Sequence, residues 1–152
     1  MSFETTIPVY EQFILHSDWQ ETSKRDTKTF RAQIKELKRA RLDYNIYHSK
    51  GNDPEVKTKI RINGRQVVEK VIPWQETAIG SADVLGDIRE DNNIEIWFGS
   101  DLGRWSELVF NVTAILGYDE KPAPLCPFPL LGIIRQNAPI LCTIWDRLFG
   151  GQ

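Results

Sequence analysis

The chain has 152 residues, 41% of them hydrophobic and 26% charged, with a formal net charge of −2 at pH 7. This composition excludes wholesale disorder, and the length suits one hydrophobic core, so we expect residues 1–152 to form a single domain. The most apolar region, residues 125–149, is broken by Arg135, Pro139 and Asp146, so we do not expect it to span a membrane.

Two cysteines, Cys126 and Cys142, are present without a CxxC pair. The N-terminal residues carry acidic groups where a secretory signal would need basic ones followed by an apolar run. These features predict a cytoplasmic protein with reduced thiols, no bound metal and no cofactor.

The first predicted elements are a short apolar segment and a long helix. Residues 7–19 suit either a strand or a short helix, because their apolar positions fit both periods. Residues 27–47 predict a helix, because proline is absent and Asp26 or Thr27 can serve as the N-cap. On a helical wheel the core-facing stripe of this helix consists of Phe30, Ile34, Leu37 and Tyr44.

Residues 56–72 predict a β-hairpin. The pair Asn63-Gly64 favours a two-residue type I′ turn, in which both residues take positive φ. A regular register from this turn pairs Ile62 with Arg65 and Ile60 with Val67, and it separates an apolar from a basic face. The predicted apolar face holds Val56, Ile60, Ile62, Val67 and Val71, and the basic face holds Lys57, Lys59, Arg61, Gln66, Val68 and Lys70.

The rest of the chain predicts one strand and two further helices. Residues 76–93 are rich in Asp and indicate a loop, whereas residues 94–99 indicate a strand. Apolar spacing and terminal glycines favour helices over 101–117 and 138–149. Together the elements predict an α+β fold, an antiparallel sheet built around the 56–72 hairpin with helices at about 27–47, 101–117 and 138–149 packed mainly on one face.

The net charge hides a strong asymmetry along the chain. Residues 24–70 carry fourteen Lys and Arg against six Asp and Glu, and the remaining residues carry five against fifteen. Such a basic segment is typical of a surface that meets an anionic partner. The asymmetry is also compatible with an acidic remainder that folds back on the basic segment, or with a second copy docked against it.

A candidate binding surface follows from the predicted helix and hairpin. Arg31, Lys35 and Arg39 recur at i, i+4, where like charges destabilise a helix, so stability alone does not explain them. If the helix lies beside the basic hairpin face, the two form one continuous patch. The candidate binding residues are Lys28, Arg31, Lys35, Lys38, Arg39, Lys57, Lys59, Arg61 and Lys70.

These residues predict a non-catalytic binding or regulatory protein of the adaptor type. Its partner is either an acidic protein surface or duplex nucleic acid, and the absence of aromatic residues within the basic stripe disfavours single strands. The alternative is a metal-dependent nuclease in which Asp43, Glu55 and Lys57 form an acid plus ExK set, with the carboxylates holding the metal. The apolar C-terminal segment predicts either part of the core or a homo-oligomer interface.

Overall fold

The computed structural model describes residues 2–100 and 102–122, which form antiparallel strands without a helix. No helix in this part of the chain is long and apolar enough to cross a membrane. The strands are β1 (Phe3–Ser17), β2 (Ser23–Arg31), β3 (Leu37–Gly51), β4 (Glu55–Ile62), β5 (Arg65–Pro73), β6 (Thr77–Asp83), β7 (Asp91–Gly99) and β8 (Ser106–Tyr118).

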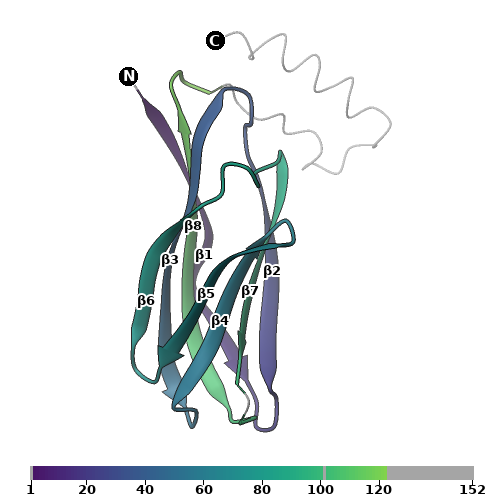
Figure 1. The fold of residues 1–152 in the computed structure, drawn as a ribbon, viewed down its shortest axis with the longest axis vertical. Helices are drawn as coiled ribbons and strands as arrows, with labels where there is room; N and C mark the ends of the chain where they lie inside the picture. Colours follow the sequence, from purple (N-terminus) through teal and green to yellow (C-terminus); the bar gives the residue numbers. More distant parts are fainter. Residues whose placement is uncertain (1, 101, 123–152) are drawn as a thin grey trace, which may run out of the picture.

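The strands form two four-stranded sheets that face each other (Figure 1). The first sheet has the order β1-β8-β3-β6, and the second has the order β2-β7-β4-β5. Consecutive strands cross repeatedly from one sheet to the other, and every pairing is antiparallel. Eight strands in this order define a β-sandwich of the jelly-roll type.

The hydrophobic core lies between the two sheets. Along the strands, buried apolar residues alternate with exposed or half-exposed ones, as expected when each sheet packs one face against the other. Burial of these side chains is the main favourable contribution to folding. The largest fully buried side chains include Tyr10, Leu42, Ile46, Ile60, Ile72, Ile96, Phe98, Phe110 and Tyr118.

The predicted α+β class is wrong, and the helix expected over 27–47 shows why. This segment contains the end of β2, a turn and most of β3, with Glu36 in the turn at a φ of 62°. Phe30 and Tyr44 are buried, as a helical stripe also requires, but the residues around Tyr44 follow a period of two. Tertiary pairing with β8 and β6 therefore overrides the local helical pattern.

The helix expected over 101–117 is also wrong, because residues 106–118 form β8. This strand is apolar on both faces near its end, so its apolar residues match a helical period as well as a strand period. The expected loop at 76–93 contains β6 and the start of β7. The helix expected over 138–149 lies outside the described residues.

The hairpin prediction is confirmed in its turn and corrected in its register. Asn63 and Gly64 have φ values of 49° and 88°, as a type I′ turn requires. A β-bulge beyond Ile60 shifts the pairing by one residue, so Ile60 lies opposite Val68 instead of Val67. Val68 and Ile72 consequently point into the core, while Val71 is on the outer face.

Candidate cation–aromatic site on the second sheet

The outer face of the second sheet carries most of its charged residues. Because side chains alternate along a strand, every second residue of β2, β4 and β7 points away from the core. Five cations and four carboxylates share this face, so its overall charge is nearly balanced. The cations are Arg25, Arg31, Lys57, Lys59 and Arg61, and the carboxylates are Glu55, Glu69, Asp91 and Glu95.

Among residues 2–100 and 102–122, ion pairs leave two of these cations without a carboxylate. Lys57 pairs with Glu69 and Arg61 with Glu95, at N–O distances of 3.6 Å and 3.4 Å. Arg25 and Lys59 form no ion pair with another residue of the described chain. Among the described residues, Glu55 is the carboxylate of this face that has no ion pair, so the unpaired charges of the face are those of Arg25, Lys59 and Glu55.

Arg25 and Lys59 flank Trp97 on the two neighbouring strands. Trp97 on β7 lies directly opposite Arg25 on β2 and directly opposite Lys59 on β4, so the three form one row across the sheet. The Lys59 ammonium lies 4.8 Å from the centroid of the Trp97 ring, which is a cation–π contact. We call these three residues the cation–aromatic row.

Gly99 sets the position of the indole. A Cβ atom at Gly99 would lie 2.5 Å from Cη2 and 2.6 Å from Cζ2 of Trp97, so the six-membered ring extends over the glycine. Any larger residue would displace the ring or the nearby backbone carbonyl of Thr22, which is 3.1 Å from that Cβ position. The absence of a side chain at Gly99 thus lets Trp97 lie along β7.

A groove of about 750 Å³ begins at this row and runs to the end of the sheet. Its walls combine the cations Lys57 and Lys59 and the carboxylates Asp53 and Glu55 with apolar side chains, of which Val71 and Leu102 are 53% and 56% exposed. The loops before β2, before β4 and after β7 close its far end. It is lined by Thr22, Ser23, Asp53, Pro54, Glu55, Val56, Lys57, Lys59, Val71, Trp97, Gly99, Ser100 and Leu102.

Two buried polar residues lie near the end of this groove, and one of them, Asp53, also lines it. Asp53 is 2% exposed, and His48 is fully buried with Nδ1 3.1 Å from the Ile72 carbonyl oxygen. Burial lowers the pKa of His48, and this effect exceeds the opposing effects of the Ile72 carbonyl and the Asp53 charge. His48 is accordingly neutral, and Nδ1 donates to Ile72.

Three of the predicted binding residues lie together, on β4. Lys57, Lys59 and Arg61 occupy successive outward positions of that strand. Lys70 is exposed on β5 but pairs with the buried Thr58, so it does not belong to the outward series. The bulge in the hairpin accounts for the separation of Lys70 from the other three.

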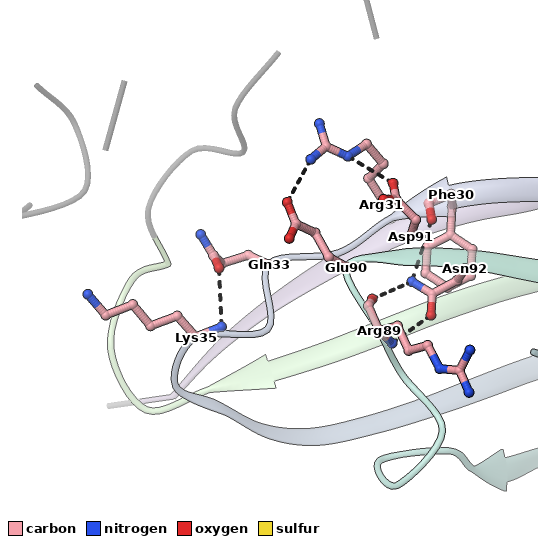
Figure 2. Close-up of polar contacts among 8 residues, drawn as sticks. All are labelled: Phe30, Arg31, Gln33, Lys35, Arg89, Glu90, Asp91 and Asn92. Atoms are coloured by element: carbon pink, nitrogen blue, oxygen red, sulfur yellow. Dashed lines mark hydrogen bonds and ion pairs between the residues drawn. The ribbon is translucent and has the colours of Figure 1, made fainter. Parts of the chain in front are cut away.

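Arg31 lies on the same outer face but at the opposite end of the sheet. Its guanidinium pairs with Glu90 through Nη2 at 2.8 Å and with Asp91 through Nε at 3.2 Å (Figure 2). Only 9% of its side chain is exposed. Arg31 therefore joins β2 to the start of β7.

The remaining four predicted residues are dispersed. Lys28 extends from the other side of β2, with its ammonium 4.9 Å from the Tyr10 ring and 4.8 Å from the Phe13 ring. Lys35 lies in the loop between β2 and β3 (Figure 2). Lys38 and Arg39 belong to β3 of the first sheet and pair with Glu36 and Asp119, respectively. The structure thus does not form one helix–hairpin patch from the nine residues.

Acidic residues outside 24–70 neutralise several arginines of the basic segment. Arg39 pairs with Asp119, Arg61 with Glu95, and Arg65 with Asp87. The hydrogen bond from Arg65 holds the pKa of Asp87 below its ordinary value. The acidic remainder therefore does fold back on the basic segment, although its described residues leave the cation–aromatic row without a carboxylate partner.

The three residues of the nuclease alternative do not converge. Asp43 lies on the outer side of β3, where its Oδ1 accepts hydrogen bonds from Arg41 and Ser81. Glu55 and Lys57 lie on β4 of the other sheet. Within residues 2–100 and 102–122, no group of three or more His, Cys, Asp or Glu side chains is placed to hold a metal ion.

Sequence reasoning missed Arg25 and Trp97. The strand containing Trp97 was predicted, and its alternation could have placed Trp97 on the same side as Glu95 and Gly99. Its position between Arg25 and Lys59 depends on pairings between strands that are far apart in the chain. No local pattern carries that information.

No protein-family model and no curated protein matches the chain. Among solved structures, one of the Gt strain of infectious bursal disease virus is 10% identical, over 77% of this chain and 33% of that one, with a TM-score of 0.49. Dimeric latent PorU from Porphyromonas gingivalis is 8% identical, over 76% of this chain and 13% of that one, with a TM-score of 0.49.

A third structure is TmCBM61 in complex with β-1,4-galactotriose, which is 8% identical, over 74% of this chain and 86% of that one, with a TM-score of 0.43. The chain spans about a third of the viral chains that it matches. None of these similarities assigns a function to this protein, so the function has to be argued from its own residues.

Proposed function

We propose that this protein is a non-catalytic binding protein that holds an anionic partner on the outer face of its second sheet. The observation that carries the proposal is the cation–aromatic row, in which Arg25 and Lys59 flank Trp97 without a carboxylate partner in the described chain. A site for anions needs such uncommitted cations, because a lysine or arginine already paired has less to gain from a ligand.

The near balance of charge over the whole face limits the kind of contact. A uniformly basic surface attracts anions over its full extent, whereas here the excess charge is local. The partner therefore places a few anionic groups at the row and the adjoining groove, which Lys57 also lines. Both an acidic protein surface and nucleic acid can supply such groups, and the adaptor role in the cytoplasm belongs to the same proposal.

Self-association through the apolar C-terminal segment stays a prediction from the sequence, because that segment lies outside the described residues. It involves a different part of the chain from the anion site. Self-association and anion binding can therefore be tested independently. Sedimentation of the protein alone tests self-association, and titration with a polyanion tests the anion site.

The test of the anion site is a fluorescence anisotropy titration with labelled polyglutamate and labelled oligonucleotides at two salt concentrations. The double variant Arg25→Gln/Lys59→Gln should weaken binding and, for nucleic acid, reduce the salt slope by about 0.7 to 0.9 for each phosphate that the protein no longer neutralises. The matched control is Lys38→Gln/Arg39→Gln, which removes two cations from the first sheet. Equal weakening in both double variants would show nonspecific attraction and would overturn the proposed site.

A further inference from the structure

We propose that the anionic partner is a single-stranded nucleic acid, with one base stacked on Trp97 and its flanking phosphates held by Lys59 and Arg25. This inference rests on the proposed function, since it assigns the ligand of the same surface. It reverses the preference for duplexes drawn from the sequence, because the structure interleaves an aromatic ring with the cations.

The order of groups across the sheet is the first argument. Neighbouring strands lie about 4.8 Å apart, so the Cα atoms of Lys59 and Arg25 stand roughly 10 Å from each other with Trp97 on the strand between them. In a nucleic-acid strand every internal base has a phosphate on its 5′ side and another on its 3′ side. A row of cation, ring and cation matches that repeating arrangement of anion, ring and anion.

Other polyanions match the row less well. A uronic-acid sugar carries one carboxylate on its own ring, and an acidic peptide carries its charges without a ring between them. In a duplex the bases are stacked inside the helix, so a protein ring on an open sheet face cannot reach their flat surfaces. Single strands expose those surfaces, and proteins that bind them combine a cationic path with aromatic stacking platforms.

The groove beside the row is the second argument. It continues from Trp97 past Lys57 and offers the exposed apolar side chains of Val71 and Leu102. A neighbouring nucleotide has both an apolar ring and a phosphate, so it can use the apolar and the cationic walls together. An acidic side chain could use only the cationic part.

Two features keep the stacking surface available. Gly99 lets the indole extend along β7 without a side chain beneath it, as the close approach of Cη2 and Cζ2 shows. The Lys59 ammonium, 4.8 Å from the ring centroid, can move to a phosphate because no carboxylate of the described chain holds it.

The experiment is an anisotropy titration of labelled oligo(U), oligo(dT), the corresponding duplex, polyglutamate and polygalacturonate with the full chain. We expect the single strands to bind tightest. Trp97→Ala should weaken their binding about 5- to 150-fold, which corresponds to the contribution of one stacked base, and Trp97→Phe should restore part of it. Circular dichroism of each variant confirms that the sandwich is folded before its affinity is compared.

Tyr47 supplies a matched control for the aromatic substitution. It is 37% exposed on β3 of the first sheet, away from the row and the groove, so Tyr47→Ala should leave the affinity unchanged. Gly99→Ala is a second test of the ring position, because it displaces the indole without removing it or changing any charge. We expect this variant to weaken single-strand binding as well.

The outcomes separate this inference from the proposed function. If Arg25→Gln/Lys59→Gln weakens binding of the polyanions but Trp97→Ala does not, the anion site stands and single-strand stacking is wrong. If duplex, polyglutamate or polygalacturonate binds more tightly than the single strands, the ligand assignment is also wrong. If neither set of substitutions changes the affinity for any probe, both proposals are overturned.

Discussion

The outer faces of the two sheets differ although their inner faces build the same core. The first sheet carries an apolar row, in which Ile14 on β1, Val109 on β8 and Tyr47 on β3 are cross-strand neighbours, with Ile79 nearby at 73% exposure. The second sheet carries charges and the cation–aromatic row in the equivalent place. Since a sandwich needs only its inner faces to be apolar, the outer faces are free to diverge.

The largest expected effect is a difference in stability between substitutions on the inner and the outer faces of the sheets. Phe110→Ala removes a fully buried ring between the sheets and should lower the free energy of unfolding by about 3–5 kcal/mol. Ile79→Ser, on the outer face of the first sheet, should change it by no more than about 0.5 kcal/mol. Urea unfolding measures both, and a large decrease for Ile79→Ser would mean that the outer apolar row is covered in solution.

We expect a smaller loss of stability when alanine replaces either of two glycines that lie against an aromatic ring, and the loss should differ between them. In Gly80→Ala the new methyl group would lie 2.7 Å from Cζ of the buried Tyr44, so we expect stability to fall by about 1–3 kcal/mol from overpacking. In Gly99→Ala the half-exposed Trp97 can move toward solvent, which should make the decrease smaller. Thermal unfolding of the two variants compares them directly, and an equal or larger decrease for Gly99→Ala would show that Trp97 is part of the rigid fold.

The smallest expected effect is the dependence of stability on pH that His48 causes. His48 lies where the two sheets meet, near the end of the groove. Its pKa in the folded state is lowered from the ordinary value of 6.5, so the unfolded chain takes up a proton more readily. The contribution of His48 to stability is therefore fully present above pH 6.5 and is lost as the pH falls toward the lower folded-state pKa. The slope is at most about 1.4 kcal/mol per pH unit.

Urea unfolding between pH 8 and 5.5 measures this dependence, and His48→Asn is the matched variant. An asparagine amide can donate to the Ile72 carbonyl from the position of Nδ1, but it does not titrate in this range. We expect the variant to show a flatter profile than the parent below pH 6.5. An unchanged profile would mean that His48 is not the group whose protonation destabilises the fold.

The parts of the fold that were predictable are the ones determined by neighbouring residues. The Asn63-Gly64 turn follows from the need for positive φ, and the strand containing Trp97 follows from its β-branched and aromatic residues. The α+β class failed because Phe30 and Tyr44 fit both a helical stripe and strands separated by a turn. Only pairing with distant strands distinguishes these arrangements.

The candidate site was also predictable only where neighbouring residues determine it. Alternation along the hairpin was enough to place Lys57, Lys59 and Arg61 on one face, whereas one bulge removed Lys70 from that series. The helical wheel grouped Arg31 with Arg39, which the structure places on different sheets. Charge by itself indicated a basic segment, but it could not show which cations the acidic remainder would neutralise.

By itself the sequence determined the turn at Asn63-Gly64, the outward positions of β4 and an excess of positive charge in one segment. Only the tertiary structure decided that the segment forms strands in two sheets, and that Trp97 lies between Arg25 and Lys59. The physical reason is that turn geometry and side-chain alternation act over a few residues, whereas cross-strand neighbours are selected by burial of a common core.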